Sequence, residues 1–352
     1  MSGMFSFSSR EDNLTVIDLA LDVFLKRQRH QDKQLSIDGN LLLNTSQVEL
    51  LKANLSSMQK EHPDRLIGIS MEFFHSCEDS KAFLHFTENL PDPSKIFFYN
   101  ILPDSDFQAR MLSDMSERQA EFDAASGVLF PVKPENADGE ILVRRCKRTI
   151  QTYLERIVAD IVFDQKSPEM LASSNVYASR YVDIKRLFMN PNALAIVIYY
   201  LSRYVLTVEK EFEALIATSK NGAVSAGLLG RMTGRKVVCC VNIGPQYALP
   251  VSAVERIHRG ERYLYICDFI CLGTEAKLLH ALLASRGAFL VGGIGVASYI
   301  PLDNPELERK HSPLAKIDSM VNLISARIPY QIYLQKDTAG PQIALSCAEA
   351  TK

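Results

Sequence analysis

The chain has 352 residues, of which 47% are hydrophobic and 23% charged, the composition of an ordinary globular protein. Its formal net charge is −2, so the chain as a whole does not attract nucleic acid or an anionic membrane, and we expect neither as a partner. At about 150 residues per domain, the length predicts two domains.

The cysteines and the first residues suggest where the protein works. The chain has 7 cysteines, an odd number without regular spacing, and several lie in apolar runs. This pattern predicts free, mostly buried thiols and a reducing compartment. The first twelve residues lack a basic region followed by an apolar core, so we expect no secretory signal. The apolar run 193–201 is shorter than the roughly 20 residues that span a bilayer. We therefore expect a cytoplasmic protein.

The first part of the chain alternates between helix-like and strand-like segments. The expected elements are a helix over 13–27, a strand pair over 35–43, a helix over 45–59 capped by Thr45 or Ser46, a strand over 65–74, a helix over 79–90, a strand over 95–102, a helix over about 105–122 and a strand over 127–132. This alternation predicts a small α/β domain over residues 1–140. The polar segment 134–140, which contains proline and glycine, is the expected linker.

Two further features of this region bear on function. His75, Cys77 and His85 lack the closed four-ligand spacing of a metal site, so we expect no metal held by protein ligands alone. A long helix is predicted from Val143 to Ile161, with a basic cluster largely off its apolar stripe: Arg144, Arg145, Lys147 and Arg148. That cluster is either a patch for phosphate or nucleic acid or a solvated helix face, and the overall charge favours the solvated face.

The second half predicts an α/β fold with a mainly parallel sheet and flanking helices. Strands are expected near 212–217, 236–241, 263–268 and 289–294, with helices between them, then a helix over about 312–325 and a strand over 328–334. These elements define a domain over 141–335 and a frayed tail over 336–352. Ligands bind such sheets at the carboxyl ends of the strands.

Two strand-to-helix loops fall at that edge. After the strand at Tyr263–Ile266 come Asp268, a glycine-containing loop and a helix that opens at Thr274. After the strand at 212–217, a helix of small residues opens at Ser219–Gly222. Loop amides and a helix dipole can bind phosphate, and an acid at a strand tip can hold ribose hydroxyls or a metal.

Three stretches carry a resemblance to a known family. YICDFICLGTE, 265–275, resembles a degenerate form of the motif with which type I phosphoribosyltransferases bind phosphoribosyl pyrophosphate (PRPP). Residues 171–201 and 212–241 resemble segments of orotate phosphoribosyltransferases that precede this motif. The resemblance implies a type I phosphoribosyltransferase-like fold over the second half of the chain, a PRPP or nucleotide ligand with Mg²⁺, and a homodimer formed through this domain.

The resemblance also implies a set of site residues. Asp268 stands at the second acid of the motif, Gly273 at its loop glycine and Thr274 beside it. The ligand-binding candidates are Ser219, Lys220, Asn221, Gly222, Asp268, Phe269, Gly273, Thr274 and Lys185. The catalytic candidates are Asp268 and Arg256, of which Arg256 either supplies charge in place of the family's loop lysine or belongs to a solvated helix end.

Several positions depart from the family pattern. Cys267 replaces the first acid, Leu272 a hydroxyl residue and Glu275 a threonine or serine near the phosphate. A carboxylate about 4 Å from one phosphate charge would cost about 4 kcal/mol at an effective dielectric constant of about 20. Either Glu275 turns away or PRPP binds weakly. Residues 242–261 lack the family's loop lysine, and Ala172 replaces a lysine near the base, so orotate is doubtful as a substrate.

Two functional hypotheses follow. The first is a phosphoribosyltransferase-like protein that binds PRPP or a related nucleotide or phosphate ligand, with altered or lost transferase activity. The alternative is a non-catalytic regulatory or interaction module, of the kind that occurs in bacterial stress or phage-defence systems. Whether the protein is an enzyme stays open, and the N-terminal domain is expected to contact a protein partner.

Overall fold

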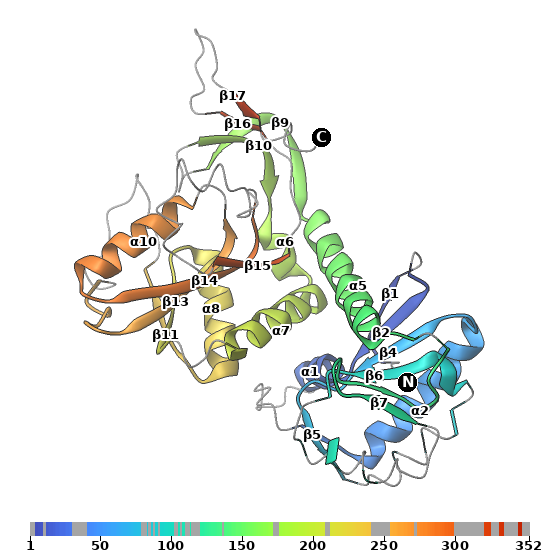
Figure 1. Cartoon of the computed structure of the whole chain (residues 1–352). Coiled ribbons are helices and arrows are strands. Elements are labelled where there is room, and N and C mark those ends of the chain that lie inside the picture. Colours follow the sequence, from blue (N-terminus) through green and yellow to red (C-terminus); the bar gives the residue numbers. More distant parts are fainter. Residues whose placement is uncertain are drawn as a thin grey trace. The chain divides into compact units, whose positions relative to one another are not determined.

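The computed structural model describes residues 4–9, 12–29, 41–78, 83, 86, 89–90, 92–101, 105, 108–109, 113, 120–135, 137–171, 176–207, 212–240, 254–270, 273–298, 320–324, 331–333 and 344–346. The chain forms two compact units, Met1–Tyr153 and Leu154–Lys352, here called the N-terminal and C-terminal units (Figure 1). The division falls within helix α5 (Gly139–Ala159), and the domain limits expected from the sequence stay predictions.

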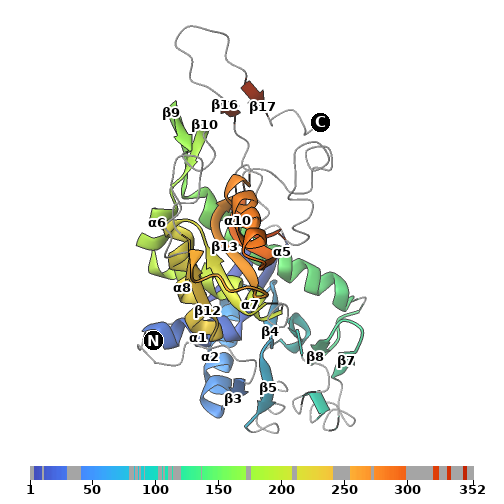
Figure 2. The same ribbon diagram turned by 90° about the vertical axis from the view of Figure 1, so that its left-hand side faces the viewer.

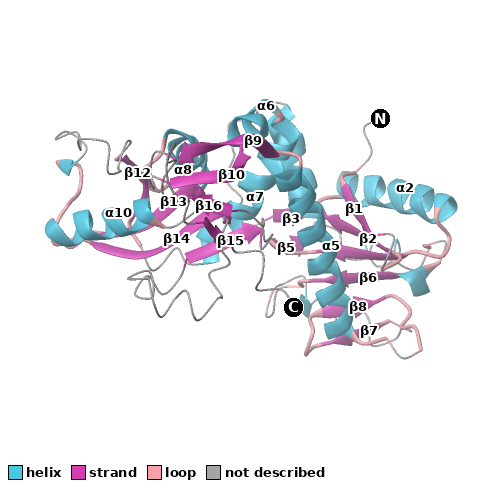
Figure 3. Ribbon diagram, turned by 90° about the horizontal axis from the view of Figure 1, so that it is seen from above, coloured by secondary structure: helices cyan, strands magenta, loops and turns pink. Residues whose placement is uncertain are grey.

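The N-terminal unit contains, within the described ranges, a six-stranded mixed sheet in the order β1-β2-β4-β6-β8-β7. Its strands are β1 (Ser6–Ser9), β2 (Leu14–Asp18), β4 (Leu66–Ser70), β6 (Ile96–Tyr99), β7 (Glu121–Asp123) and β8 (Val128–Phe130). The central strands β2, β4 and β6 are parallel, and antiparallel strands flank them. Figure 3 shows β1, β2, β6, β8 and β7 in this succession.

Shorter elements complete this unit. They are α1 (Leu19–Arg29), α2 (Thr45–Glu61), the one-turn helix Pro93–Lys95, and the parallel pair β3 (Leu41–Leu43) and β5 (Phe74–Cys77). α2 confirms the helix expected over 45–59, but its cap is Asn44. The side chain of Asn44 accepts from the Gln47 amide, and Gln47 bonds back to the Asn44 amide.

Three elements of this unit differ from those predicted. The helix expected over 13–27 is wrong at its start, because Leu14–Asp18 is a strand buried at every position and α1 begins only at Leu19. A strand buried on both faces has apolar residues at spacings that also fit a helix. The strand expected over 65–74 divides into β4 and β5, and the helix expected over 105–122 does not include Glu121, which begins β7. Strands β6 and β8 confirm the predictions over 95–102 and 127–132. Most of 79–90 and 105–120, and all of 35–40, lie outside the described residues.

Helix α5 confirms the long helix predicted around 143–161. It packs against the sheet of the N-terminal unit at Gly68, where an added Cβ would lie 2.7 Å from the Cys146 sulfur. A residue with a Cβ at position 68 would therefore clash with Cys146 and with the Phe97 ring. Arg144, Lys147 and Arg148 are exposed.

The C-terminal unit contains, in its described part, a five-stranded parallel sheet in the order β12-β11-β13-β14-β15. The strands are β11 (Ala214–Ala217), β12 (Lys236–Cys239), β13 (Arg262–Ile270), β14 (Phe289–Ser298) and β15 (Met320–Ile324), and the helices are α6 (Ile184–Met189), α7 (Pro191–Thr207), α8 (Lys220–Thr233) and α10 (Thr274–Ser285). The fold class predicted from the sequence, α/β with a mainly parallel sheet and flanking helices, is confirmed.

A separate antiparallel sheet in this unit has the order β17-β16-β10-β9. Its strands are β9 (Val162–Leu171), β10 (Val176–Val182), β16 (Gln331–Tyr333) and β17 (Ala344–Ser346), which gather at one end of the unit in Figures 1 and 2. The helix expected over 312–325 is wrong at Met320–Ile324, a short apolar run that pairs as β15 with β14. The expected fraying is wrong at Ala344–Ser346, which pairs with β16.

Two global expectations can be checked over the described residues. Among the described cysteines none forms a disulfide, and all but the half-buried Cys239 are buried: Cys77, Cys146, Cys240 and Cys267. No helix in the described ranges is long and apolar enough to cross a membrane.

Candidate functional site

The register of β11 and β13 brings two predicted loops to the same edge of the sheet. Ile216 of β11 pairs with Tyr265 of β13, so Ser219 and Asp268, each three residues further on, lie at the same level. The Ser219 hydroxyl donates to Asp268 Oδ1 at 3.2 Å, and Asn221 Nδ2 donates to Asp268 Oδ2 at 3.1 Å. The structure thus joins three of the predicted site residues directly at the carboxyl end of the parallel strands.

The first turn of α8 is built around Ser219. Ser219 is the N-cap, and its hydroxyl accepts from the Gly222 amide at 2.9 Å. Lys220 and Asn221 follow in the first turn, where Lys220 is exposed. The half-buried Asp268 carboxylate therefore lies at the helix N-terminus, where the helix dipole stabilises negative charge.

The packing of α8 against β13 requires a glycine at position 222. An added Cβ would lie 2.9 Å from the Ser219 hydroxyl and 3.0 Å from the carbonyl oxygen of Ile266 in β13. Gly222 therefore lets α8 approach the backbone of β13. The expected approach of a phosphate to Gly222 stays a prediction.

The second loop opens α10 at Gly273. This buried glycine is the N-cap, has a left-handed backbone with φ of 67°, and has no side-chain bond capping the helix. Residues with a Cβ are strained in this conformation, which explains the glycine. Thr274 and Glu275 form the first turn, and Phe269 pairs with Ala297 within β13 and β14. Cys271 and Leu272 lie outside the described residues.

Glu275 is held by two hydroxyls that the sequence reasoning did not identify. Thr218 donates to Glu275 Oε2 at 2.6 Å, and Tyr265 donates to the same oxygen at 3.4 Å. The hydroxyls of Thr218 and Tyr265 are 2.8 Å apart, and both residues are buried. Burial raises the pKa of the Tyr265 phenol well above its usual range, so this residue stays a neutral donor. The Glu275 carboxylate is therefore turned to the end of β11.

Cys267 cannot replace the acid whose position it occupies. It is 2% exposed, and its thiol contacts the Ile294 carbonyl oxygen at 3.6 Å. Burial raises the pKa of this thiol well above its usual range, so the group is neutral. Successive strand residues also face opposite sides of the sheet, so Cys267 and the following Asp268 point apart.

The two remaining predicted cations are Arg256 and Lys185. Burial raises the pKa of the Cys239 thiol at the end of β12, and the charge of Arg256 opposes this rise. Lys185 is exposed in the first turn of α6, where its amide donates to Asp183 Oδ1 at 3.2 Å. Among the described residues, no hydrogen bond or ion pair joins Arg256 or Lys185 to Asp268.

The described residues offer little to a resident metal ion. No group of three or more His, Cys, Asp or Glu side chains in the described ranges could hold one. Asp268 already accepts two hydrogen bonds and Glu275 is bound by Thr218. The donors present fit Mg²⁺ only as an ion that arrives with the phosphates of a ligand. The side chains of His75 and His85 lie outside the described residues.

Comparisons with known proteins give similarity of fold only. No protein-family model and no curated protein matches the chain. An orotate phosphoribosyltransferase from Aeropyrum pernix is similar with 16% identity and a TM-score of 0.37, over 50% of this chain and 92% of that chain. An adenine phosphoribosyltransferase from Saccharomyces cerevisiae is similar with 14% identity and a TM-score of 0.37, over 49% and 99%.

A third similar structure is the adenine phosphoribosyltransferase from Trypanosoma brucei, solved with AMP, pyrophosphate and ribose-5-phosphate. It shares 13% identity with a TM-score of 0.37, over 57% of this chain and 90% of that chain. These neighbours have the type I phosphoribosyltransferase fold, and the similarity extends over about half of this chain. Sequence identities and TM-scores of this size do not indicate the activity of this chain.

Proposed function

We propose that the C-terminal unit binds PRPP or a related nucleotide or phosphate ligand at the carboxyl edge of its parallel sheet, with altered or lost transferase activity. The observation that carries the proposal is the position of Asp268, fixed by Ser219 and Asn221 at the first turn of α8. In a complex, Asp268 would accept from ribose hydroxyls. Backbone amides that could bind phosphate lie in the turn at Gly273 and in the first turns of α8 and α10. Lys220 would add a positive charge there.

Mg²⁺ enters this proposal as part of the ligand. Asp268 is the residue that would hold the ion, and the ion would supply positive charge to the phosphates of the ligand. Binding of PRPP should therefore be stronger with Mg²⁺ than without it, since the ion offsets the repulsion between phosphate and the carboxylates of Asp268 and Glu275.

Altered or lost turnover is supported by the chemistry of the same residues. The position of the first acid is a buried neutral thiol, Cys267. Arg256 is expected to take the place of the family's loop lysine. Among the described residues it has no contact with Asp268. Departure of pyrophosphate needs positive charge placed where negative charge develops. In the described part of the chain, Asp268 forms no hydrogen bond or ion pair with Lys220, Lys185 or Arg256.

The second candidate function is a non-catalytic regulatory or interaction module, including one that acts in a bacterial stress or phage-defence system. It is favoured by the hydrogen bonds of the site, because Asp268 and Glu275 are both satisfied by groups of the protein itself. A ligand must then exchange these bonds rather than fill free ones. We further propose a homodimer formed through the C-terminal unit, a protein partner of the N-terminal unit and a cytoplasmic location.

Calorimetric titration of the full chain with PRPP, with and without Mg²⁺, tests the proposal. Saturable binding that needs Mg²⁺ supports it, and product analysis with candidate bases then separates transferase from regulator. Asp268→Asn should abolish the binding, whereas Asp160→Asn, an exposed carboxylate of the same unit, should leave it unchanged. Absence of binding at about 1 mM PRPP, an affinity of about −4 kcal/mol, would overturn the proposal for PRPP. Equal binding by the wild type and Asp268→Asn would overturn the assignment of the site.

A further inference from the structure

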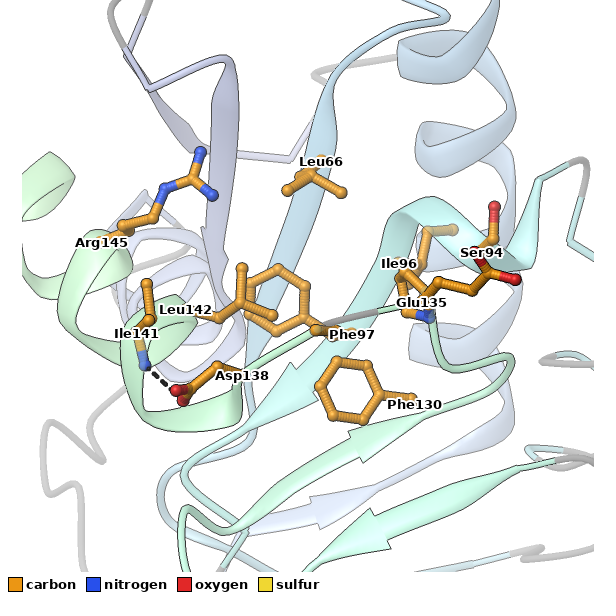
Figure 4. A pocket seen from close by; sticks show the side chains of 12 residues that line it. Leu66, Ser94, Ile96, Phe97, Phe130, Glu135, Asp138, Ile141, Leu142 and Arg145 are labelled. Carbon is orange, nitrogen blue, oxygen red and sulfur yellow. Dashed lines mark hydrogen bonds between the residues drawn. The ribbon is translucent and has the colours of Figure 1, made fainter.

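The pocket in the N-terminal unit, about 210 Å³ in volume, offers a ligand no free ring and no unbalanced charge. Phe97 and Phe130, which line it, are only 2% and 1% exposed, so neither presents a ring face. The exposed carboxylate of Asp138 lies on the same side of the pocket as Arg145 (Figure 4). A more closely defined polar network lies in the C-terminal unit, where two buried hydroxyls meet a carboxylate.

The two hydroxyls, of Thr218 and Tyr265, lie on the face of the parallel sheet that α10 covers. Every second side chain of a strand faces the same way, so Thr218, directly after β11, shares a face with Ile216. Ile216 and Tyr265 belong to one buried cluster with Leu279 of α10. The hydroxyls therefore lie where this apolar cluster ends, at the carboxyl edge of the sheet.

The hydroxyls form a chain of hydrogen bonds that ends on Glu275. Thr218 donates its one proton to Glu275 Oε2 at 2.6 Å. The contact of 2.8 Å between Thr218 and Tyr265 must therefore use the proton of Tyr265, which Glu275 Oε2 shares at 3.4 Å. Hydrogen bonds in such a chain strengthen one another. Thr218 and Tyr265 are both buried, so water does not compete for these donors.

Glu275 has a competing position on its own helix. It lies in the first turn of α10, whose N-cap, Gly273, has no side-chain bond to the helix. The first backbone amides of a helix have no partner within the helix, and together with the helix dipole they attract a carboxylate. A phosphate group of a ligand would use the same amides. A Glu275 side chain that is not held elsewhere would therefore compete with the ligand for these donors and also repel it.

We propose that Thr218 and Tyr265 are positioning residues that hold the Glu275 carboxylate at the end of β11 and so keep the first turn of α10 open to a phosphate group. This inference rests on the phosphate site proposed above for the C-terminal unit. The Thr218 hydroxyl acts directly on Glu275, and the Tyr265 hydroxyl acts mainly through Thr218. Repulsion between two charges falls with their separation, so the two hydroxyls weaken the repulsion of phosphate by Glu275 without abolishing it.

Calorimetric titration of the full chain with PRPP and Mg²⁺ tests the role of Thr218. Thr218→Val removes the hydroxyl and keeps a similar shape, so it should weaken PRPP binding at least tenfold. Thr218→Ser keeps the hydroxyl and should bind within about threefold of the wild type. Tyr265→Phe should weaken PRPP binding by less than Thr218→Val. The control is Thr233→Val, which removes a hydroxyl bonded to the Leu229 carbonyl oxygen in the last turn of α8 and should leave PRPP binding unchanged.

A double-mutant cycle with Glu275→Gln separates this role from simple packing. In the Glu275→Gln background no negative charge needs to be held away, so Thr218→Val should change PRPP binding by less than about threefold. The same loss in both backgrounds would mean that Thr218 acts through packing, and would overturn the proposal. Unchanged binding by Thr218→Val alone would also overturn it. If Thr218→Val does not fold, Tyr265→Phe decides in the same cycle: a loss of affinity that requires Glu275 supports the proposal, and any other result refutes it.

The same titrations distinguish failure of this inference from failure of the proposed function. If no protein of the series binds PRPP at about 1 mM, the phosphate site is wrong and the inference is wrong with it. If Glu275→Gln binds PRPP and the wild type does not, the site stands but the inference is wrong, because Thr218 and Tyr265 then fail to hold Glu275 away. If the wild type binds PRPP and the effect of Thr218→Val does not depend on Glu275, only the inference is wrong.

Discussion

The contact between Asp268 and Asn221 can be measured directly by a double-mutant cycle. Asp268→Ala removes a carboxylate that accepts from Ser219 at 3.2 Å and from Asn221 at 3.1 Å, whereas Asn221→Ala removes only the second bond. A hydrogen bond to a charged group contributes about 1.5–3 kcal/mol when buried. Asp268 is half-buried, so we expect a coupling energy of about 1 kcal/mol for the pair and a total loss of about 2 kcal/mol for Asp268→Ala.

Urea unfolding of the four proteins gives the coupling energy, and thermal melting gives a second measure. For a unit of this size, a loss of about 2 kcal/mol lowers the Tm by about 4–8 °C. The control cycle pairs Asp268→Ala with Lys220→Ala, which changes an exposed neighbour of Asn221 in the same helical turn. A coupling energy for Asp268 and Asn221 within about 0.3 kcal/mol of zero would refute this reading of the site.

Three further predictions concern single residues. Glu275→Gln keeps an acceptor for Thr218 but removes the negative charge. In calorimetry, PRPP should therefore bind at least tenfold more tightly, a gain of about 1.4 kcal/mol in binding free energy. An unchanged affinity would mean that the Glu275 carboxylate lies away from the phosphate. Gly222→Ala should cost about 1–3 kcal/mol in thermal unfolding, because its Cβ would lie 3.0 Å from the Ile266 carbonyl oxygen. Gly227→Ala in the same helix, with no atom within 4 Å of the added Cβ, should be neutral or stabilising, and equal losses in the two variants would contradict the packing argument. Burial raises the pKa of the Cys240 thiol from 9.0 to about 11. Above pH 9 this thiol ionises in the unfolded chain before it ionises in the folded protein, so its contribution to the free energy of unfolding is complete below pH 9 and is lost between about pH 9 and 11. In Cys240→Val, the free energy of unfolding should therefore decrease less steeply between about pH 9 and 11 than in the wild type. The same slope in both proteins would contradict this prediction.

The paired loops could be predicted because their signal is local. An apolar run followed by a helix opening at Ser219 or Thr274 defines a strand-to-helix turn, and the carboxyl ends of parallel strands lie at one edge. The sequence could not show that Thr218 and Tyr265 bind Glu275, since residues separated by 57 and 10 positions meet only after the sheet has formed. It also could not separate the strand Leu14–Asp18 from α1, because burial on both faces removes the alternation that identifies a strand.

The hydrogen bonds of the site determine what a ligand must achieve. Asp268 already places a negative charge at the first turn of α8, the position that would otherwise attract an anion. A phosphate group that approaches this turn must therefore bring a cation or displace the carboxylate, and displacement loses two bonds. The turn at Gly273 has no side-chain cap, and Glu275 in its first turn is held by Thr218 instead. The first turn of α10 is thus open to a phosphate at a lower cost than the first turn of α8. If this reasoning holds, omission of Mg²⁺ should weaken PRPP, which has a pyrophosphate group, far more than AMP, and equal weakening would show that both ligands meet the same carboxylates.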